Sequence, residues 1–239
     1  MIDKAWLTQA VALYGITLTP EQAEKLDTYA RLLVEWNEKM NLTAITDGVG
    51  IAAKHFADSL SAYPHLPKTA FSLVDVGTGA GFPGVPLALV RSDCKLTLLD
   101  SLQKRLTFLD ALCRELGIPV TLIHARAEEA GQNPAWREGF DVVTARAVAA
   151  MPVLCEYCLP LVKPGGRFIA MKGPDGEREL TDAAKAIALL GGAPGVSHAL
   201  TLAVPGGETQ ERRILTVDKI QPTPAKYPRP TAKMAKSPL

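Results

Sequence analysis

The stretch of sequence that decides the fold reads FSLVDVGTGAGFPG and spans residues 71–84. It begins with an apolar run, FSLVDV, of the length of a buried strand. The glycines that follow allow a sharp turn into a helix and a close approach of the backbone to a ligand. Gly79, Gly81 and Gly84 spell GxGxxG, which alone is weak evidence for a dinucleotide site. We therefore expect a cofactor-binding turn here, because α/β sheets bind ligands at the carboxyl ends of their strands.

Further apolar runs predict the rest of the sheet. They are KLTLLD (95–100), PVTLIH (119–124), FDVVTA (140–145) and GRFIAM (166–171). Because these runs alternate with longer amphipathic stretches, they indicate βαβ units and a parallel sheet that is covered on both faces. A last run, ERRILTV (211–217), follows a stretch rich in glycine and proline at 191–207 and predicts a closing antiparallel strand at or near the edge. The fold class is therefore α/β, with a doubly wound, Rossmann-like sheet that is mostly parallel.

The N-terminal part of the chain, residues 1–66, is expected to be helical. TPEQ (19–22) combines a capping threonine, a proline at the first helical position and a glutamine three residues after the cap. Apolar residues then recur at spacings of three and four, which predicts one buried face: Leu26, Tyr29, Leu33, Trp36 and Met40. We therefore divide the chain into an N-terminal helical segment (1–66), a sheet-containing domain (67–218) and a C-terminal tail (219–239).

Charge is distributed unevenly along the chain, although the formal net charge is only +1. The tail carries five of the 26 basic residues and none of the 25 acidic ones: Lys219, Lys226, Arg229, Lys233 and Lys236. A basic tail on a mildly acidic body suggests a polyanionic partner, whereas a purely solubilising tail is the simpler alternative. The prolines from Pro222 onward predict that the tail is extended and accessible.

The N-terminus and the cysteines limit the location and the chemistry of the protein. Charged residues interrupt MIDKAWLTQAVALYG (1–15), so it does not resemble a signal peptide, and no stretch approaches the roughly 20 apolar residues of a membrane span. We therefore expect a cytoplasmic protein without a membrane segment. Cys155 and Cys158 have metal-like spacing, but no second pair of ligands accompanies them. We expect no metal site and four free thiols, with this pair packed in a helix.

Two aspartates and a second turn indicate which cofactor the glycine-rich stretch holds. Asp100 ends the next strand, where it could bind the ribose hydroxyls of either a dinucleotide or S-adenosylmethionine. Asp75, two residues before Gly77, suits the positively charged amino group of a methionine moiety and would repel a pyrophosphate. KPGG (163–166) is a turn typical of S-adenosylmethionine-dependent methyltransferases. These features favour S-adenosylmethionine, and an NAD-dependent oxidoreductase remains the alternative.

Several motifs together resemble one known family. They are NLT (41–43), HFADSL (55–60), DVGTGAGFPGVPLA (75–88), DSLQKRLTFL (100–109), RAE (126–128), TARA (144–147), KPGG (163–166) and KYPRPTAKMAKSPL (226–239). In this order they resemble the rRNA small subunit methyltransferase G family, also called glucose-inhibited division protein B. The resemblance implies a class I methyltransferase that methylates N7 of a guanine in 16S rRNA. It would act as a monomer on 16S rRNA or the small ribosomal subunit. A non-catalytic ribosome-binding factor is the other alternative.

The resemblance also implies which residues hold the cofactor. With the residues of the glycine-rich turn, the expected cofactor ligands are Asp75, Gly77, Gly79, Phe82, Asp100, Ala127, Glu128 and Arg146. Phe82 offers an apolar wall, and Glu128 could accept a hydrogen bond from the adenine amino group. Arg146 is the expected catalytic residue, because it could orient guanine through O6 or hold a phosphate. Guanine N7 has no proton to lose, so we expect no general base.

Cations on two parts of the chain are expected to contact RNA. They are Lys104, Arg105 and Lys172 in the domain, and Lys226, Arg229, Lys233 and Lys236 in the tail. Removing residues 226–239 should then weaken RNA binding and leave cofactor affinity nearly intact. His55 and Asp58 are three residues apart and would share one face of a helix, as an acid/base pair or as a structural hydrogen bond. Neither of these two residues is assigned a role.

Overall fold

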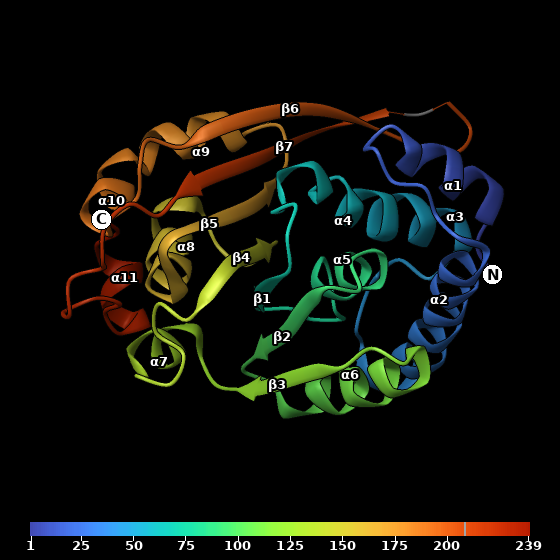
Figure 1. Cartoon of the computed structure of the whole chain (residues 1–239), viewed down its shortest axis with the longest axis horizontal. Helices are drawn as coiled ribbons and strands as arrows, with labels where there is room; N and C mark the ends of the chain where they lie inside the picture. The colour runs from blue at the N-terminus through green and yellow to red at the C-terminus, as the bar shows by residue number, and fades with distance from the viewer. Residues whose placement is uncertain (208) are drawn as a thin grey trace.

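Seven strands form one sheet in the computed structural model, which describes residues 1–207 and 209–239 (Figure 1). The strands are β1 (Phe71–Val76), β2 (Cys94–Asp100), β3 (Val120–His124), β4 (Phe140–Arg146), β5 (Val162–Lys172), β6 (Val196–Ala203) and β7 (Thr209–Asp218). Their order across the sheet is β3-β2-β1-β4-β5-β7-β6. β1 pairs in parallel with both β2 and β4, and β7 is antiparallel to both of its neighbours. The predicted doubly wound, mostly parallel α/β fold is confirmed.

The edge strand β6 was not predicted. It lies in the stretch that was read as a connection rich in glycine and proline, and that reading is wrong for residues 196–203. Within β6 only Leu202 is buried, because the strand lies at the edge of the sheet and many of its side chains face solvent. Such a strand leaves no apolar run in the sequence. The antiparallel strand predicted at 211–217 is present as β7, one position in from the edge.

Helices cover both faces of the sheet (Figure 1). They are α1 (Lys4–Ala12), α2 (Pro20–Met40), α3 (Gly48–Gly50), α4 (Asp58–Leu60), α5 (Gly84–Val90), α6 (Gln103–Leu116), α7 (Ala127–Gln132), α8 (Met151–Cys158), α9 (Gly176–Asp182), α10 (Ala184–Leu189) and α11 (Thr231–Lys236). The remaining helical segments are the π-helix η1 (Ile51–Ala57) and the 3-10 helices η2 (Tyr63–His65) and η3 (Leu159–Leu161). The π-helix η1 joins α3 to α4 without a break. Such π-helical turns are frequent at functional sites.

The start of α2 has the predicted capping box. Thr19 Oγ1 accepts a hydrogen bond from the backbone N–H of Gln22 at 3.2 Å, and the Gln22 side chain accepts one from the Thr19 N–H at 3.0 Å. Leu26, Tyr29 and Leu33 are fully buried along the predicted apolar face. They belong to the same hydrophobic core as side chains of β1 and β2, so the N-terminal helices pack directly on the sheet.

Alternate residues of each central strand contribute to two cores, one on each face of the sheet. In β1, Leu73 belongs to the core that includes α2, α5 and α6, and Val74 belongs to the core that includes α7 and α8. The same alternation separates Ile169 from Phe168 in β5. Because both faces are buried, these strands read as continuous apolar runs, which is why the sequence predicted them.

The C-terminal tail is folded against the body of the protein, so the expectation of an extended tail is wrong. Tyr227 is 6% exposed, and Met234 in α11 is fully buried. Lys219 is buried as well, and its Nζ donates hydrogen bonds to Leu159 O and to the Thr223 hydroxyl, both at 2.7 Å. Figure 1 shows α11 beside α7 and α8 at one end of the sheet. Prolines stiffen the tail, but its buried apolar side chains and its hydrogen-bonded polar side chains make it pack on the body of the protein.

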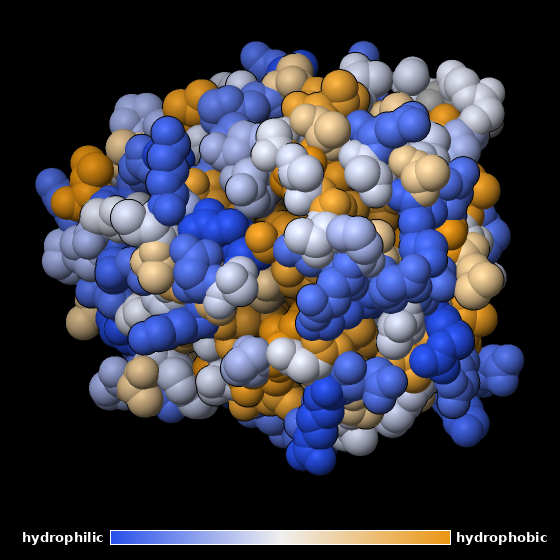
Figure 2. Space-filling view, turned by 45° about the vertical axis from the view of Figure 1, so that its right-hand side comes forward, coloured by the Kyte–Doolittle hydropathy of each residue, from blue (hydrophilic) through white to orange (hydrophobic). Residues whose placement is uncertain are grey.

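The surface is mixed in character. Hydrophilic residues cover most of the face shown in Figure 2, and hydrophobic residues reach the surface between them near its centre. Large apolar residues that are exposed singly, such as Leu13 and Ile220, are ordinary on a folded protein. Within residues 1–207 and 209–239, no helix combines the length and the apolar character that crossing a membrane requires.

Candidate functional site

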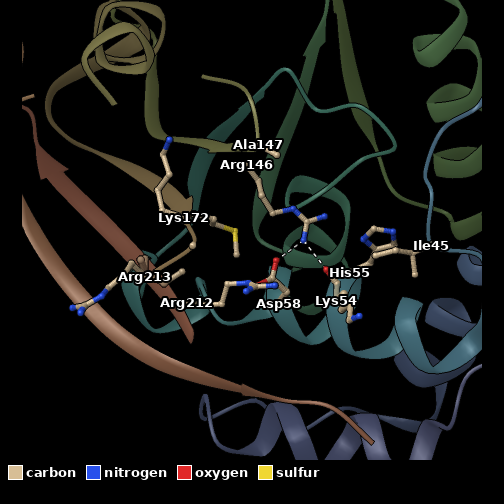
Figure 3. A pocket seen from close by; sticks show the side chains of 12 residues that line it. Ile45, Lys54, His55, Asp58, Arg146, Ala147, Lys172, Arg212 and Arg213 are labelled. Carbon is tan, nitrogen blue, oxygen red and sulfur yellow. Dashed lines mark hydrogen bonds and ion pairs between the residues drawn. The ribbon is translucent and has the colours of Figure 1, made fainter. Parts of the chain in front are cut away.

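Two neighbouring cavities lie at the carboxyl ends of the parallel strands, where the strand order reverses between β1 and β4. The glycine-loop cavity, of about 280 Å³, is lined by Val76, Gly77, Leu99, Asp100, Ser101, Arg105, Ala125, Arg126, Ala127, Glu128, Ala147, Val148, Tyr157 and Thr231. The arginine cavity (Figure 3), of about 400 Å³, is lined by Ile45, Lys54, His55, Asp58, Arg146, Ala147, Met171, Lys172, Gly173, Arg212, Arg213 and Ile214.

Asp100 organises one part of the glycine-loop cavity. It ends β2 and is only 1% exposed. Its carboxylate accepts hydrogen bonds from the backbone N–H groups of Gly79 at 3.0 Å and Leu102 at 2.9 Å, and from Arg105 Nη1 at 3.2 Å. A carboxylate has about four acceptor sites, so Asp100 can still accept a bond from a ligand hydroxyl. Arg105, which was expected at an RNA-facing rim, lies in this cavity and is paired with Asp100.

Gly77 keeps the backbone of the turn close to the cavity. Its φ of 65° lies in the left-handed region that favours glycine. A Cβ atom on Gly77 would lie 2.8 Å from Val148 Cγ2, and both residues line the cavity. The glycine therefore leaves open a space that a side chain would fill, as expected of a turn that cradles a cofactor.

Asp75 supports the glycine-rich loop from inside the protein. It is fully buried, and its carboxylate accepts hydrogen bonds from the Thr78 hydroxyl at 2.7 Å, the Gly84 N–H at 3.0 Å and the Thr144 hydroxyl at 3.0 Å. Burial raises the pKa of Asp75 to about 6. Asp75 lines neither of the two cavities. In the structure Asp75 therefore supports the loop, and its contact with a methionine amino group stays a prediction.

Another part of the glycine-loop cavity combines residues from distant parts of the chain. Ala127 and Glu128 begin α7, Tyr157 lies on α8, and Thr231 begins α11. The Thr231 hydroxyl donates a hydrogen bond to Glu128 Oε1, and the Tyr157 hydroxyl lies 3.3 Å from Thr231 Oγ1. The sequence suggested Ala127 and Glu128 but missed the other two residues. Thr231 is 103 positions from Glu128, and no sequence pattern connects them.

Asp58 holds two arginines at the arginine cavity. Asp58 is 4% exposed, and its carboxylate accepts hydrogen bonds from Arg146 Nη1 at 2.6 Å and Arg212 Nε at 2.9 Å. Figure 3 shows both guanidinium groups directed at Asp58, whereas Arg213 points away from it. The sequence predicted Arg146 but missed Arg212, which it placed in a closing strand. Asp58, to which it assigned no role, supplies the negative charge that fixes both cations.

His55 makes a structural contact with Thr43, and not the hydrogen bond with Asp58 that was one of the two alternatives. Its Nε2 atom lies 2.8 Å from Thr43 Oγ1, and its ring stacks on Phe82 with the centroids 4.5 Å apart. Burial, and after it the charge of Arg146, lowers the pKa of His55 to about 4. Phe82 also stacks on Tyr29 and lies under the Arg146 guanidinium at 5.1 Å. Phe82 thus supports Arg146 and does not itself line either cavity.

Ala147 lies where the two cavities meet, since it lines both of them. It follows β4 and has a φ of 56°, which is uncommon for a residue other than glycine. Such a backbone conformation costs on the order of 1 kcal/mol and tends to cluster at functional sites. The unusual turn carries the chain from Arg146, in one cavity, to Val148, in the other.

Comparison with known proteins identifies the family. The family described as rRNA small subunit methyltransferase G matches residues 22–203. This chain belongs to the rRNA small subunit methyltransferase G family. A "Ribosomal RNA small subunit methyltransferase G" from Exiguobacterium sp. is 48% identical to it over 240 residues, which cover 100% of both chains. Another of the same name, from Listeria innocua, is 49% identical over 232 residues and 96% of both chains.

Solved structures with little sequence similarity share the fold of this family member. A precorrin-6y C5,15-methyltransferase from Geobacter metallireducens has a TM-score of 0.54 at 15% identity and covers 68% of this chain and 87% of its own. A variant of the 16S rRNA (adenine(1408)-N(1))-methyltransferase from Catenulisporales acidiphilia has a TM-score of 0.51 at 17% identity, with coverages of 64% and 87%. The family makes the chain an S-adenosylmethionine-dependent methyltransferase. The alternatives of an NAD-dependent oxidoreductase and a non-catalytic factor are therefore not supported.

The remaining cations that were expected to contact RNA in this methyltransferase differ in their surroundings. Lys172 lines the arginine cavity, where its Nζ donates to Ala149 O at 2.6 Å and to Glu179 Oε2 at 2.8 Å. Arg229 is paired with the buried Glu156. The exposed members of the set are Lys104, Lys226, Lys233 and Lys236. Among the residues that the structure describes, these four cations form no ion pair, whereas Arg105, Lys172 and Arg229 each pair with a carboxylate.

The cysteines of this methyltransferase are packing residues. Cys155 and Cys158 are buried in α8, and burial raises the pKa of Cys155 to about 12. Such a thiol stays protonated at neutral pH and is a poor nucleophile or metal ligand. Among residues 1–207 and 209–239, the structure contains no cluster of three or more histidine, cysteine, aspartate or glutamate side chains that could hold a metal ion.

Proposed function

We propose that this chain transfers the methyl group of S-adenosylmethionine to N7 of a guanine in 16S rRNA. The observation that carries the proposal is the junction at Ala147, where the cavity of the glycine-rich turn meets the cavity of the arginines. A cofactor in the first cavity and a nucleobase in the second would meet there. Relatives named ribosomal RNA small subunit methyltransferase G support an RNA substrate. N7 of guanine is the acceptor that the family resemblance implies.

The glycine-loop cavity is the proposed cofactor site. The cofactor supplies an electrophilic methyl group on a sulfonium. Asp100 would accept hydrogen bonds from the ribose hydroxyls and Glu128 from the adenine amino group, while Gly77 lets the backbone approach the methionine part. Gly79 acts through the N–H that it donates to Asp100, and Asp75 acts through the loop that it supports. The carboxylates and the open glycine turn therefore fit the cofactor.

The arginine cavity is the proposed site of the target guanosine. Its volume of about 400 Å³ is in the range of small-molecule sites. A base inside a duplex would have to leave its stack to enter such a pocket. Arg146 would donate to guanine O6, which shares one edge of the base with N7, and Arg212 would hold a phosphate. Because Asp58 fixes both guanidinium groups, N7 would be presented toward Ala147.

The chemistry needs orientation more than proton transfer. The N7 lone pair forms the bond to the methyl carbon while the carbon–sulfur bond breaks, and its electron pair stays on sulfur. The guanine ring takes up the positive charge, and no proton moves. His55 is neutral near pH 7, since its pKa is lowered to about 4, and its Nε2 atom is engaged with Thr43. Positioning in line is therefore the main catalytic contribution of the protein, as expected for two reactants held at close range.

The arrangement of the two cavities also suggests the oligomeric state of the enzyme, its contact with RNA and its cellular location. We infer that the enzyme works as a monomer, because one chain supplies the residues that line both cavities. The RNA would meet the exposed cations Lys104, Lys226, Lys233 and Lys236. An enzyme that acts on ribosomal RNA or the small subunit would work in the cytoplasm.

Transfer of a labelled methyl group tests the proposal. The substrates are small subunits and naked 16S rRNA that lack the modification. Nuclease mapping identifies the labelled nucleotide, and chromatography of the digested nucleosides identifies the methylated atom. Label at N7 of a single guanine supports the proposal, and label on a different atom or on no RNA refutes it. Arg146→Ala should abolish most of the transfer and keep the affinity for S-adenosylhomocysteine. A thermal shift with S-adenosylhomocysteine and none with NAD checks the cofactor independently.

A further inference from the structure

We propose that the C-terminal segment 227–236 is a wall of the cofactor site, in which Thr231 positions the Glu128 carboxylate for the adenine amino group. The inference deepens the proposed function and rests on it, since it takes the glycine-loop cavity as the cofactor site. It replaces the expectation that removal of the tail leaves cofactor affinity nearly intact. Thr231 is a positioning residue, because it acts on the cofactor through Glu128.

A buried ion pair anchors the segment next to the cavity. Glu156 is fully buried, and its carboxylate accepts hydrogen bonds from Arg229 Nε at 2.8 Å, from Arg229 Nη2 at 2.6 Å and from the Arg229 backbone N–H at 2.7 Å. A buried carboxylate is stable only when it is paired in this way. Arg229 is therefore committed to Glu156, and it fixes the chain two residues before Thr231.

Side chains in and near α7 hold the backbone of the same segment. Arg137 Nη1 donates to Tyr227 O at 2.7 Å, and Gln132 Nε2 donates to Pro228 O at 2.9 Å. A Cβ atom on Gly131 would lie 2.9 Å from Pro228 Cγ, so the segment packs on α7 without room for a larger residue. Through these contacts the tail is a fixed part of the structure at this point.

Thr231 joins the segment to the proposed adenine ligand. Its hydroxyl has one proton, which it donates to Glu128 Oε1. The Tyr157 hydroxyl, 3.3 Å from Thr231 Oγ1, must then be the donor in their contact. All three residues line the glycine-loop cavity. The chain of hydroxyl groups fixes one carboxylate oxygen of Glu128 and leaves the other, Oε2, to accept a hydrogen bond from a ligand.

This arrangement predicts a chemical preference. The adenine amino group is a donor and suits a fixed carboxylate oxygen, whereas the carbonyl oxygen of an inosine base at the same position is an acceptor and would be repelled. A carboxylate that can rotate away discriminates less between the two. The ratio of the affinities for S-adenosylhomocysteine and S-inosylhomocysteine therefore reports on how firmly Glu128 is held.

Titration calorimetry of the full-length protein with these two ligands tests the proposal. Thr231→Val keeps the shape of the side chain and removes the hydroxyl. It should weaken S-adenosylhomocysteine binding by about five- to tenfold, less than the full effect of a hydrogen bond to a charged group because Thr231 acts only through Glu128, and change S-inosylhomocysteine binding by less than about twofold. Thr231→Ser restores the hydroxyl and should restore the wild-type ratio. Ser237→Ala, just after the same helix and exposed, is the matched control and should leave both affinities unchanged.

Two results would overturn the inference. In the first, Thr231→Val binds both S-adenosylhomocysteine and S-inosylhomocysteine with the wild-type affinities. In the second, Thr231→Val loses affinity for both ligands by the same factor, which would mean that the segment lines the cavity without positioning Glu128. The melting midpoint without ligand shows whether each variant is folded. Failure of the wild-type protein to bind S-adenosylhomocysteine would instead refute the proposed function, so the two failures can be told apart.

Discussion

Asp58→Asn removes the charge that holds the arginine cavity together. In the structure Asp58 is 4% exposed, and its carboxylate accepts one hydrogen bond from each of Arg146 and Arg212. Hydrogen bonds to charged groups contribute about 1.5–3 kcal/mol each, and stranding a buried charge costs about 3–5 kcal/mol. The Arg146 and Arg212 side chains are 14% and 25% exposed, so water can partly solvate them, and asparagine keeps one acceptor oxygen. We therefore expect a loss of about 2–4 kcal/mol of unfolding free energy.

Urea unfolding measures this loss, and single-turnover transfer measures its consequence. Released from Asp58, Arg146 should no longer orient the acceptor base, and the rate of transfer should fall at least about tenfold. The affinity for S-adenosylhomocysteine should stay the same, because Asp58 does not line the glycine-loop cavity. Asp110→Asn is the matched control. Its carboxylate pairs with Arg114 on the surface, and such a pair contributes at most about 1 kcal/mol.

A small effect would refute the reasoning. If the unfolding free energies of Asp58→Asn and the wild-type protein differ by less than about 0.5 kcal/mol, water solvates the two guanidinium groups well enough without their counter-charge. If its transfer rate is also unchanged, Arg146 does not need Asp58 to be positioned. An equal loss of stability in Asp110→Asn would mean that the effect comes from the change in net charge and not from the contact of Asp58 with the two arginines.

Three further predictions concern His55, Asp100 and the pH dependence of transfer. Because burial lowers the pKa of His55 from 6.5 to about 4, the folded protein binds this proton less tightly than the unfolded chain. Its contribution to stability is therefore present above pH 6.5 and lost as the pH falls toward about 4. Urea unfolding of the wild-type protein should lose about 2–3 kcal/mol more than His55→Gln between about pH 7 and pH 4.5, and equal losses would contradict the assigned shift. Asp100→Ala should weaken S-adenosylhomocysteine binding by about 1–3 kcal/mol, because the ribose hydroxyls lose a charged acceptor, and an unchanged affinity in calorimetry would remove Asp100 from the site. The rate of single-turnover methyl transfer should be nearly constant between about pH 6 and pH 9. A rate that rises about tenfold per pH unit in the wild-type protein, but not in His55→Ala, would show that a histidine acts as a base.

The sequence predicted the parts of the fold that bury both faces of a strand. β1 was predicted with its bounds, since the run 71–76 is mostly apolar and ends at a glycine turn. Edge strand β6 was missed, because its alternating exposed residues resemble a loop once glycine and proline surround them. The folded tail was missed for a related reason. Its anchors are single residues, such as Tyr227 and Met234, that leave no periodic pattern.

The candidate site was predictable only where its residues share a local motif. Gly77 and Arg146 stand at strand ends in motifs that can be read directly, and both line a cavity. Arg212 and Thr231 enter the same cavities from distant segments, and only the folded chain shows that they do. Asp75 lies in the most informative motif of all, yet its carboxylate faces the protein interior. A motif predicts where a residue lies in the chain, whereas its hydrogen-bond partners decide which way its side chain faces.

The cations of the tail therefore belong to two physical classes. Arg229 neutralises the buried Glu156, whereas Lys233 and Lys236 are exposed and can act on RNA phosphates through a salt-dependent attraction. Both classes lie on one segment, which also places Thr231 at the glycine-loop cavity. An RNA contact that shifts α11 would alter the hydrogen bond from Thr231 to Glu128 and with it the hold on adenine. Since binding free energies are reciprocally linked, a bound cofactor that fixes this hydrogen bond would favour the same position of α11 for RNA.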